Sequence, residues 1–431
     1  MKFVSTRAQA PAASLSQALR NGAAPDGGLY MPEVIPAAPA GLDPHAQLAA
    51  FATELLKPFF EGDDLDSDLP AICAEAFDFP VPIVVPDPEQ PGLNAIELFH
   101  GPTGAFKDFG ARFLMGCFDR LAGSEPLNVL VATSGDTGGA VGCAAENRSS
   151  VRATILFPHG RVSPFQERQL TCWGENVQAL DIDGDFDDCQ QLVKEAFADP
   201  DMASEHRLTS ANSINFGRLL PQLAYTARAV LQVHARTGVE PGVVVPSGNL
   251  GQGFSILLAK AMGLPVGPVV LATNANRTLK DWRDTGKYAA RPSLETLANA
   301  MDVGNPSNFE RVAALETEPA DVQVELVTDE QIRARISADY RRSGYVWCPH
   351  SATAAEAYAR LDPKAQSERP WIVAATAHPY KFADIVEPLI GTKIEPTPAL
   401  AAIYERSTRK VEISADLGSL EGALRGKMAV A

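Results

Sequence analysis

The chain has 431 residues, of which 45% are hydrophobic and 21% are charged, a composition typical of a folded globular protein with an ample core. Its formal net charge of −16 argues against nucleic acid or an anionic membrane surface as a partner. The start of the chain has no apolar stretch typical of a signal peptide, and no apolar run approaches the roughly 20 residues that span a bilayer. We therefore expect a cytoplasmic protein that binds neither nucleic acid nor membrane.

The cysteines are also typical of a reducing compartment. All six are scattered, without a Cys-x-x-Cys pair or paired histidine spacing, and the seven histidines are equally dispersed. Buried free thiols are therefore expected, and no metal site is predicted.

The first 90 residues differ in amino-acid composition from the rest of the chain. They are rich in Ala, Pro and Asp, and a helix is predicted over 45–56, where apolar residues recur at spacings of three and four. A proline-punctuated extended connection follows over 80–88. We therefore predict a small N-terminal unit, 1–90, and a second region, 91–431.

In the second region, short apolar strands alternate with helices. The predicted strands and helices are listed by their ranges: strands 127–132, 152–157, 176–182, 243–245, 269–273 and 371–376; helices 140–146, 163–172, 185–197 and 254–262. All-apolar strands separated by helices indicate an α/β fold in which parallel sheets are covered on both faces. We expect two α/β subdomains, the smaller over about 110–220.

Lys107 stands between Phe106 and Asp108, behind Gly and Pro residues and before a helical run at 111–115. A lysine buried in apolar surroundings has a lowered pKa, and its neutral amine can attack a carbonyl. The alternative is a lysine that extends to solvent from the first turn of a helix. The local sequence favours that alternative.

Two glycine-rich turns follow predicted strands, where open α/β sheets bind ligands. The turn at 247–253 offers backbone N–H groups and a helix start to a phosphate, without the pattern of a P-loop or of a dinucleotide-binding loop. The turn at 133–138 gathers the hydroxyls of Thr133, Ser134 and Thr137 around Gly135, which suits a carboxylate, with Asp136 as the only charge. For both turns the alternative is structural: a tight connection or a helix cap.

Two further polar features complete the candidates. Asn212, Ser213 and Arg218 can clamp an oxyanion or phosphate, or can instead form a helix cap with a surface arginine. Thr376 ends an apolar strand, which alone indicates a structural role. His378, before a proline, is predicted to be a satisfied loop histidine.

Six segments in order resemble the threonine synthase family of fold-type II, pyridoxal 5′-phosphate-dependent enzymes. They lie at 27–32, 101–109, 133–138, 212–215, 247–251 and 376–379, and so span most of the chain. The resemblance implies a tryptophan synthase β-like fold and a lyase of threonine biosynthesis. Its reaction converts O-phospho-L-homoserine and water into L-threonine and phosphate by γ-elimination and β-addition of water.

The resemblance also assigns roles to residues. It implies that Lys107 holds the cofactor as a Schiff base and that Asp136 lies near the cofactor's 3′-oxygen. The cofactor phosphate would lie on Ser247, Gly248, Asn249, Leu250 and Gly251, and Thr376 would bind the pyridine nitrogen. The substrate carboxylate would be held by Thr133, Ser134, Gly135 and Thr137, and the substrate phosphate by Asn212, Ser213 and Arg218.

Three alternative functions remain open from the sequence. A threonine or serine dehydratase-like enzyme of the same fold type would share Lys107 and the phosphate loop, without needing the clamp of Asn212, Ser213 and Arg218. A nucleotide-dependent dehydrogenase lacks the expected Gly-x-Gly-x-x-Gly. The third alternative is a non-catalytic small-molecule binder.

Overall fold

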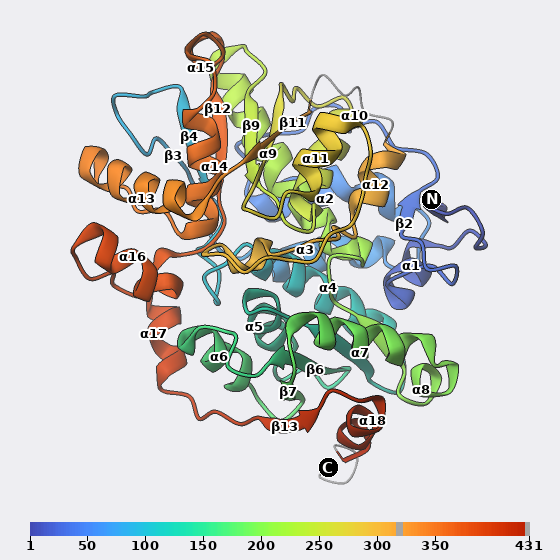
Figure 1. Cartoon of the computed structure of the whole chain (residues 1–431). Helices are drawn as coiled ribbons and strands as arrows, with labels where there is room; N and C mark the ends of the chain where they lie inside the picture. Colours follow the sequence, from blue (N-terminus) through green and yellow to red (C-terminus); the bar gives the residue numbers. More distant parts are fainter. Residues whose placement is uncertain (316–321, 427–431) are drawn as a thin grey trace.

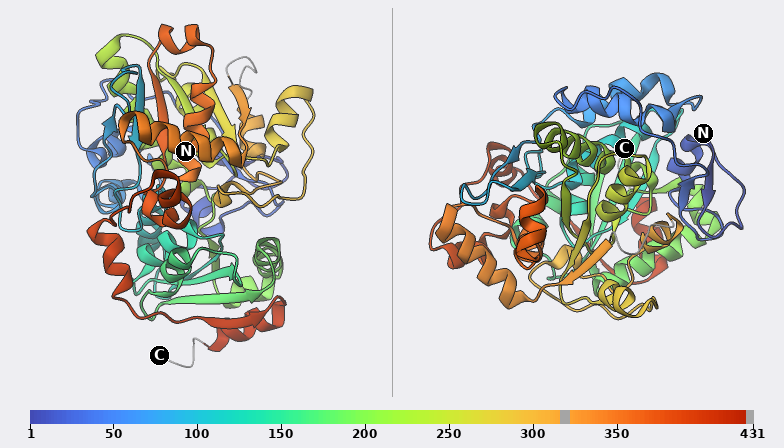
Figure 2. Two further views of the ribbon diagram at one scale, coloured as in Figure 1. Left: turned by 60° about the vertical axis from the view of Figure 1, so that its left-hand side comes forward. Right: turned by 90° about the horizontal axis from the view of Figure 1, so that it is seen from above.

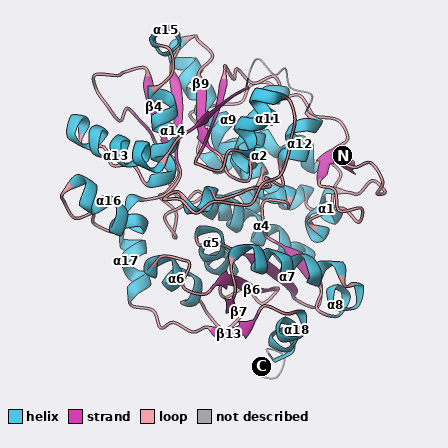
Figure 3. Ribbon diagram, viewed as in Figure 1, coloured by secondary structure: helices cyan, strands magenta, loops and turns pink. Residues whose placement is uncertain are grey.

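The computed structural model describes residues 1–315 and 322–426. Figure 1 shows two sheet-centred units one above the other, with helices α4 (Lys107–Leu121) and α5 (Asp136–Ala145) between the two sheets. Helices flank both sheets (Figure 3), as the alternation of strands and helices predicted.

The smaller sheet has five parallel strands in the order β13-β7-β6-β5-β8. Its strands are β5 (Leu127–Ala132), β6 (Val151–Pro158), β7 (Val177–Asp183), β8 (Leu208–Ser210) and β13 (Val411–Ser414). Its further helices are α6 (Pro164–Thr171), α7 (Phe186–Ala198), α8 (Pro200–Glu205) and α18 (Leu417–Gly426). The predicted strands at 127–132, 152–157 and 176–182 are confirmed. The prediction missed β8, which has three residues, and β13, which lies at the sheet edge and is largely exposed.

The larger sheet has six strands in the order β11-β10-β9-β12-β4-β3, all parallel except β3. They are β3 (Ile83–Val84), β4 (Leu93–Glu97), β9 (Gly242–Pro246), β10 (Val269–Thr273), β11 (Val322–Leu326) and β12 (Trp371–Ala375). Alternate residues of β9 face opposite sides: Val243 and Val245 join one hydrophobic cluster and Val244 joins another. Helices α9 (Leu220–Thr237) and α10 (Gly251–Ala261) contribute to the first cluster, and α14 (Pro349–Ala359) to the second. Burial on both faces explains why β9 and β12 are apolar throughout. The sequence analysis missed β3, β4 and β11, of which β4 and β11 include polar residues.

The remaining helices of the second region lie around the two sheets. They are α11 (Thr278–Thr285), α12 (Phe309–Ala314), α13 (Asp329–Ser343), α15 (Pro363–Glu368), α16 (Ala383–Ile390) and α17 (Pro398–Tyr404). The C-terminal segment runs from the larger unit down to the smaller one (Figure 2, left). Among the described helices, none is long and apolar enough to cross a membrane.

The N-terminal segment packs into the same core as the two sheets. It contains the antiparallel pair β1 (Phe3–Ser5) and β2 (Tyr30–Pro32). Helix α1 (Leu15–Asn21) lies between these strands in the chain, and α2 (Leu48–Phe60) and α3 (Leu69–Ala76) come after them. Helix α2 contacts α9, and α3 contacts α4, so the blue segment lies along one side of the molecule (Figure 2, right). We propose 1–90 as an N-terminal unit and 91–431 as the catalytic region, its smaller subdomain over about 110–220 extended by β13 and α18.

Two helices begin earlier than predicted. Helix α5 begins at Asp136 and α10 at Gly251, whereas the sequence predicted starts at 140 and 254. The prediction was wrong at these ends because it assigned the glycines to turns. The structure requires small residues there instead: a Cβ on Gly138 would lie 2.6 Å from Leu170 Cδ2. Glycine here permits close packing of the first helical turn.

Candidate active site

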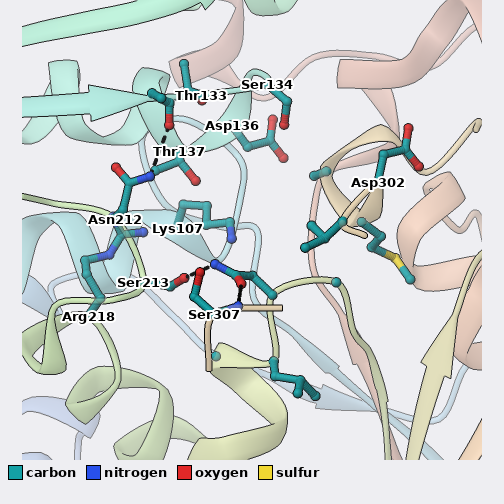
Figure 4. Close-up of a pocket in the computed structure, with 18 of the residues that line it drawn as sticks. Lys107, Thr133, Ser134, Asp136, Thr137, Asn212, Ser213, Arg218, Asp302 and Ser307 are labelled. Atoms are coloured by element: carbon teal, nitrogen blue, oxygen red, sulfur yellow. Dashed lines mark hydrogen bonds between the residues drawn. The ribbon is translucent and has the colours of Figure 1, made fainter. Parts of the chain in front are cut away.

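A pocket opens where the carboxyl ends of strands from both sheets meet (Figure 4). Lys107, at the start of α4, faces the turn after β5, the segment after β8, the turn after β9 and the end of β12. Every predicted site residue lines this pocket except Gly135. The lining residues among them are Lys107, Thr133, Ser134, Asp136, Thr137, Asn212, Ser213, Arg218, Ser247, Gly248, Asn249, Leu250, Gly251 and Thr376.

The two residues before Lys107 are fixed to the segment that follows β12. The N–H of Phe106 donates to the Thr376 carbonyl over 2.8 Å, and the chain at Ala105 forms a bridge with Ala377. Lys107 Nζ lies 4.3 Å from the centre of the Phe106 ring and faces the pocket, not the outer surface. Burial, and to a smaller extent the nearby Arg218, lower the pKa of Lys107 to about 8 against the opposing effect of Asp136. A neutral amine is therefore accessible near neutral pH.

In the turn after β5, one hydroxyl caps a helix and two line the pocket. The Thr133 hydroxyl accepts hydrogen bonds from the N–H groups of Gly135 and Gly138, each over 3.0 Å, so it caps α5. Gly135 has a φ of 141°, and a Cβ there would lie 2.5 Å from Gln166 Nε2, so only glycine fits. Ser134 and Thr137 lie on the pocket wall (Figure 4), where their hydroxyls can meet a ligand.

Asp136 is the buried acid of the pocket. Its Oδ1 accepts a hydrogen bond from Gln166 over 3.1 Å and lies 3.1 Å from Lys381 Nζ. Burial alone would raise the pKa of Asp136, but Lys381, His350 and Gln166 more than offset that effect and lower it below its ordinary value. The sequence analysis missed all three partners, because each lies on an element remote from Asp136 in the chain.

The turn after β9 has the geometry of an anion cradle. The N–H groups of Gly248 to Gly251 donate no hydrogen bond to another described residue, and they stand at the start of α10. A Cβ on Gly248 would lie 2.7 Å from Met301 Cα, so a side chain cannot fit. Leu250 adopts a left-handed φ of 62°, which is uncommon for a leucine. These features fit a phosphate bound by backbone amides.

A segment that the sequence analysis missed supports this cradle. The N–H of Ser307 donates to Asn249 Oδ1 over 2.5 Å, and Asn308 Nδ2 donates to the Asn249 carbonyl over 2.9 Å. Asn249 Nδ2 in turn donates to Ser213 Oγ over 2.8 Å (Figure 4). The segment at 305–308 is thus linked through Asn249 to Ser213, so it joins the turn after β9 to the segment after β8. Its polar Asn-Pro-Ser-Asn sequence at 305–308 was the available signal.

Arg311 anchors the same segment to the N-terminal unit. This fully buried guanidinium donates to the carbonyls of Tyr30, Ser213 and Ile214 over 3.1, 3.2 and 2.6 Å, and to Asn308 Oδ1 over 2.7 Å. Burial lowers the pKa of Arg311 to about 9. The N-terminal unit therefore contacts the pocket wall through this side chain.

Arg218 is a buried cation without an ion pair among the described residues, although the buried Asp108 raises its pKa against the larger effect of burial. One of its Nη groups donates to the Ala211 carbonyl, its Nε has no partner, and it forms no ion pair within the described part of the chain. Burial lowers the pKa of Arg218 to about 10. Asn212 beside it has an unpartnered buried Oδ1 and donates to the Ala132 carbonyl over 3.2 Å. An unpaired guanidinium on a pocket wall is suited to an anionic ligand.

The end of β12 places Thr376 on the pocket floor. The Ser351 hydroxyl accepts a hydrogen bond from the Thr376 N–H over 2.9 Å and lies 3.4 Å from its hydroxyl. His378 lies outside the pocket lining and accepts a bond from the Tyr380 N–H over 3.3 Å, which confirms the prediction of a satisfied loop histidine. His350 does line the pocket and was missed.

The cysteine prediction is confirmed for the described residues: all six are free thiols, five of them buried. His159, Asp181 and Glu412 have ligand atoms within 4.8 Å of one another. Lys410 Nζ already lies 2.7 Å from Asp181 Oδ2, so that carboxylate has a cation partner away from the pocket.

Most of the chain, including the residues that line this pocket, matches families of known proteins. Residues 96–376 match the family described as pyridoxal-phosphate dependent enzyme, 2–77 match the threonine synthase N terminus, and 351–423 match the C-terminal threonine synthase family. The chain is 36% identical over 433 residues to the threonine synthase of Serratia marcescens, covering 99% of each protein.

Solved structures agree with this match. The crystal structure of threonine synthase from Escherichia coli superposes with a TM-score of 0.91 at 34% identity, over 99% of this chain and 100% of that one. A pyridoxal phosphate-bound threonine synthase from Brucella melitensis gives a TM-score of 0.90 at 33% identity, over 99% of both chains.

Proposed function

The chain belongs to the threonine synthase family of pyridoxal phosphate-dependent enzymes, and from that premise we propose that it converts O-phospho-L-homoserine and water into L-threonine and phosphate. The observation that carries the choice of substrate is the unpaired Arg218 guanidinium, which lines the same pocket as Lys107. A substrate with a phosphate on its side chain supplies the missing anion. We also infer a cytoplasmic location, which the free thiols favour.

The pocket fits the cofactor of the family. We propose that Lys107 binds its aldehyde carbon, that the free N–H groups of Gly248 to Gly251 bind its phosphate, and that Thr376 meets its pyridine nitrogen. The close approach of Met301 to Gly248 and the unpartnered amides at the start of α10 support the phosphate position. When bound, pyridoxal phosphate stores the electron pair released at the substrate's Cα.

The chain's own residues supply binding and proton transfer. The hydroxyls of Ser134 and Thr137 and the N-terminal end of α5 hold the substrate carboxylate. The neutral Lys107 amine, released when substrate is bound, accepts the proton from Cα. Arg218, with Asn212 and Ser213, binds the phosphate and stabilises the negative charge that develops as the Cγ–O bond breaks. The same amine is placed to take a proton from Cβ as well, and Cγ gains a proton to become the methyl group. Water then forms the new C–O bond at Cβ, and a proton returned to Cα completes L-threonine.

A dehydratase-like reaction of the same fold type is the second candidate. It acts on an unphosphorylated hydroxyl amino acid and leaves Arg218 without an anion in the bound state, which a buried guanidinium disfavours. The phosphorylated substrate therefore accounts better for this residue.

The test is to supply the cofactor-loaded protein with O-phospho-L-homoserine and to measure phosphate and L-threonine together. We expect equal amounts of both products, and no turnover by Lys107→Ala. Release of ammonia and a 2-oxo acid from threonine or serine, without phosphate-linked threonine formation, would instead establish the dehydratase.

A further inference from the structure

A second lysine lies buried beside the proposed cofactor site. Lys381 is in the short helix η5 (Pro379–Phe382), directly after the segment of Thr376, and its side chain is 0% exposed. Its Nζ lies 3.1 Å from Asp136 Oδ1, and it donates to the Thr103 carbonyl over 2.8 Å and to Gln169 Oε1. A buried ammonium with three acceptors is fully satisfied. The proposed reaction assigns no role to it.

The charge of Asp136 depends on this lysine. The titratable groups that face Asp136 are Lys381 from η5, His350 and Cys348 from the start of α14, and Lys107 from α4. Burial lowers the pKa of His350 to about 4, so this imidazole is neutral near pH 7. Burial raises the pKa of the Cys348 thiol, which is neutral as well.

Lys107 is assigned to the cofactor and forms no ion pair with Asp136 among the described residues, whereas Lys381 Nζ lies 3.1 Å from Asp136 Oδ1. Lys381 then remains the fixed cation next to the Asp136 carboxylate. Both partners of the carboxylate among the described residues, Lys381 and Gln166, contact Oδ1. The second oxygen, Oδ2, is therefore available to the pocket, which Asp136 lines.

Resting on the proposed placement of Asp136 beside the cofactor's 3′-oxygen, we propose that Lys381 is a positioning residue that keeps Asp136 ionised and directs its free oxygen toward the cofactor. A buried carboxylate next to the 3′-oxygen would otherwise take up a proton, because desolvation favours its neutral form. The Lys381–Asp136 pair has no net charge, so it fixes a hydrogen-bond acceptor at this position without adding a net negative charge.

The proposal predicts a new titration when the cation is removed. In Lys381→Met, Asp136 retains its burial and loses its strongest source of stabilisation, so its pKa rises by up to several units. The visible absorbance of the bound cofactor then acquires a pH-dependent step in the neutral range. In the unmodified protein the pKa of Asp136 lies below its ordinary value, so Asp136 contributes no step there.

The experiment records absorbance against pH for the cofactor-loaded protein without substrate. The variants are Lys381→Met, Lys381→Arg, which keeps a cation, and the double variant Lys381→Met with Asp136→Asn. Lys410→Met is the matched control, because Lys410 also pairs with a buried aspartate, Asp181, but lies outside the pocket. If Lys381→Met does not fold, Lys381→Gln takes its place, since it removes the charge and retains a hydrogen-bond donor.

We expect the additional step in Lys381→Met and its absence from the other three variants. An unchanged titration in Lys381→Met with only a lower melting temperature would show that the lysine merely fastens the two units together, and would overturn the proposal. Persistence of the step in the double variant would overturn it as well, because the titrating group would not be Asp136. Absorbance requires no substrate, so failure of the proposed substrate leaves this test intact.

Discussion

Replacing Arg218 by methionine should separate substrate binding from stability. Burial lowers the pKa of Arg218 to about 10, which corresponds to a penalty of about 3 kcal/mol on the charged guanidinium relative to one in water. The residue has no ion pair within the described chain to offset that penalty. A buried charge replaced by an apolar side chain of similar length is often neutral or stabilising. We therefore expect a melting temperature equal to or above that of the unmodified protein.

The same substitution should strongly impair the reaction. A charge-assisted hydrogen bond contributes about 1.5–3 kcal/mol, and the phosphate would lose at least one, so kcat/KM for O-phospho-L-homoserine should fall by about 10- to 150-fold. The dissociation constant of pyridoxal phosphate, followed by absorbance, should change by less than about threefold, a difference below 1 kcal/mol.

Arg228→Met is the matched control, because Arg228 donates to the Ala46 carbonyl over 3.0 Å and does not line the pocket. It should leave kcat/KM unchanged. If Arg218→Met weakened cofactor and substrate binding equally, or if it left phosphohomoserine turnover intact, the assignment of Arg218 to the substrate phosphate would be refuted.

Three further predictions follow from the pocket. Gly248→Ala places a Cβ 2.7 Å from Met301 Cα, a backbone atom that cannot rotate away, so overpacking of about 1–3 kcal/mol should weaken cofactor binding by about 5- to 150-fold in a spectroscopic titration. Arg311→Met removes the donor from one buried and two part-buried carbonyls and should lower the free energy of unfolding by about 2–4 kcal/mol in urea, whereas an unchanged value would show that Arg311 does not anchor the N-terminal unit. The pKa of Lys107 is lowered to about 8, so its amine is mostly protonated below that pH, and recombination of the apoenzyme with pyridoxal phosphate should accelerate as pH rises through 8 and then level off. Asp136→Asn removes an anion that raises this pKa and should therefore move the midpoint of the rate profile to lower pH. A midpoint near the pKa of a free lysine would contradict the account.

The sequence predicted six strands because burial on both faces leaves an apolar signal, but it missed β4, a largely buried strand that includes the polar Asn94 and Glu97. It failed at β13, where Val411 is exposed and the pairing with β7 depends on a return of the chain from the far end of the sequence. It also placed the starts of α5 and α10 too late, since glycines that allow close packing resemble glycines that make turns. Tertiary context decides both cases.

The candidate site shows a similar division. Residues proposed to meet ligands, such as Lys107 at the start of α4 and Ser134 in the turn after β5, could be proposed from motifs. The residues that hold the pocket side chains in place could not be predicted from motifs. Lys381 contacts Asp136 from an element that follows β12, and Arg311 contacts Ser213 from α12. Neither side chain has a local pattern that distinguishes it from a surface cation, and only the fold shows that both are buried.

The most direct test of the central claim is to reduce the cofactor-loaded protein with borohydride and to locate the label by peptide mapping. The account predicts a yellow protein whose visible absorbance is bleached by borohydride, with one pyridoxyl group on Lys107. A colourless protein, or a pyridoxyl group on Lys381 or any other lysine, would contradict it.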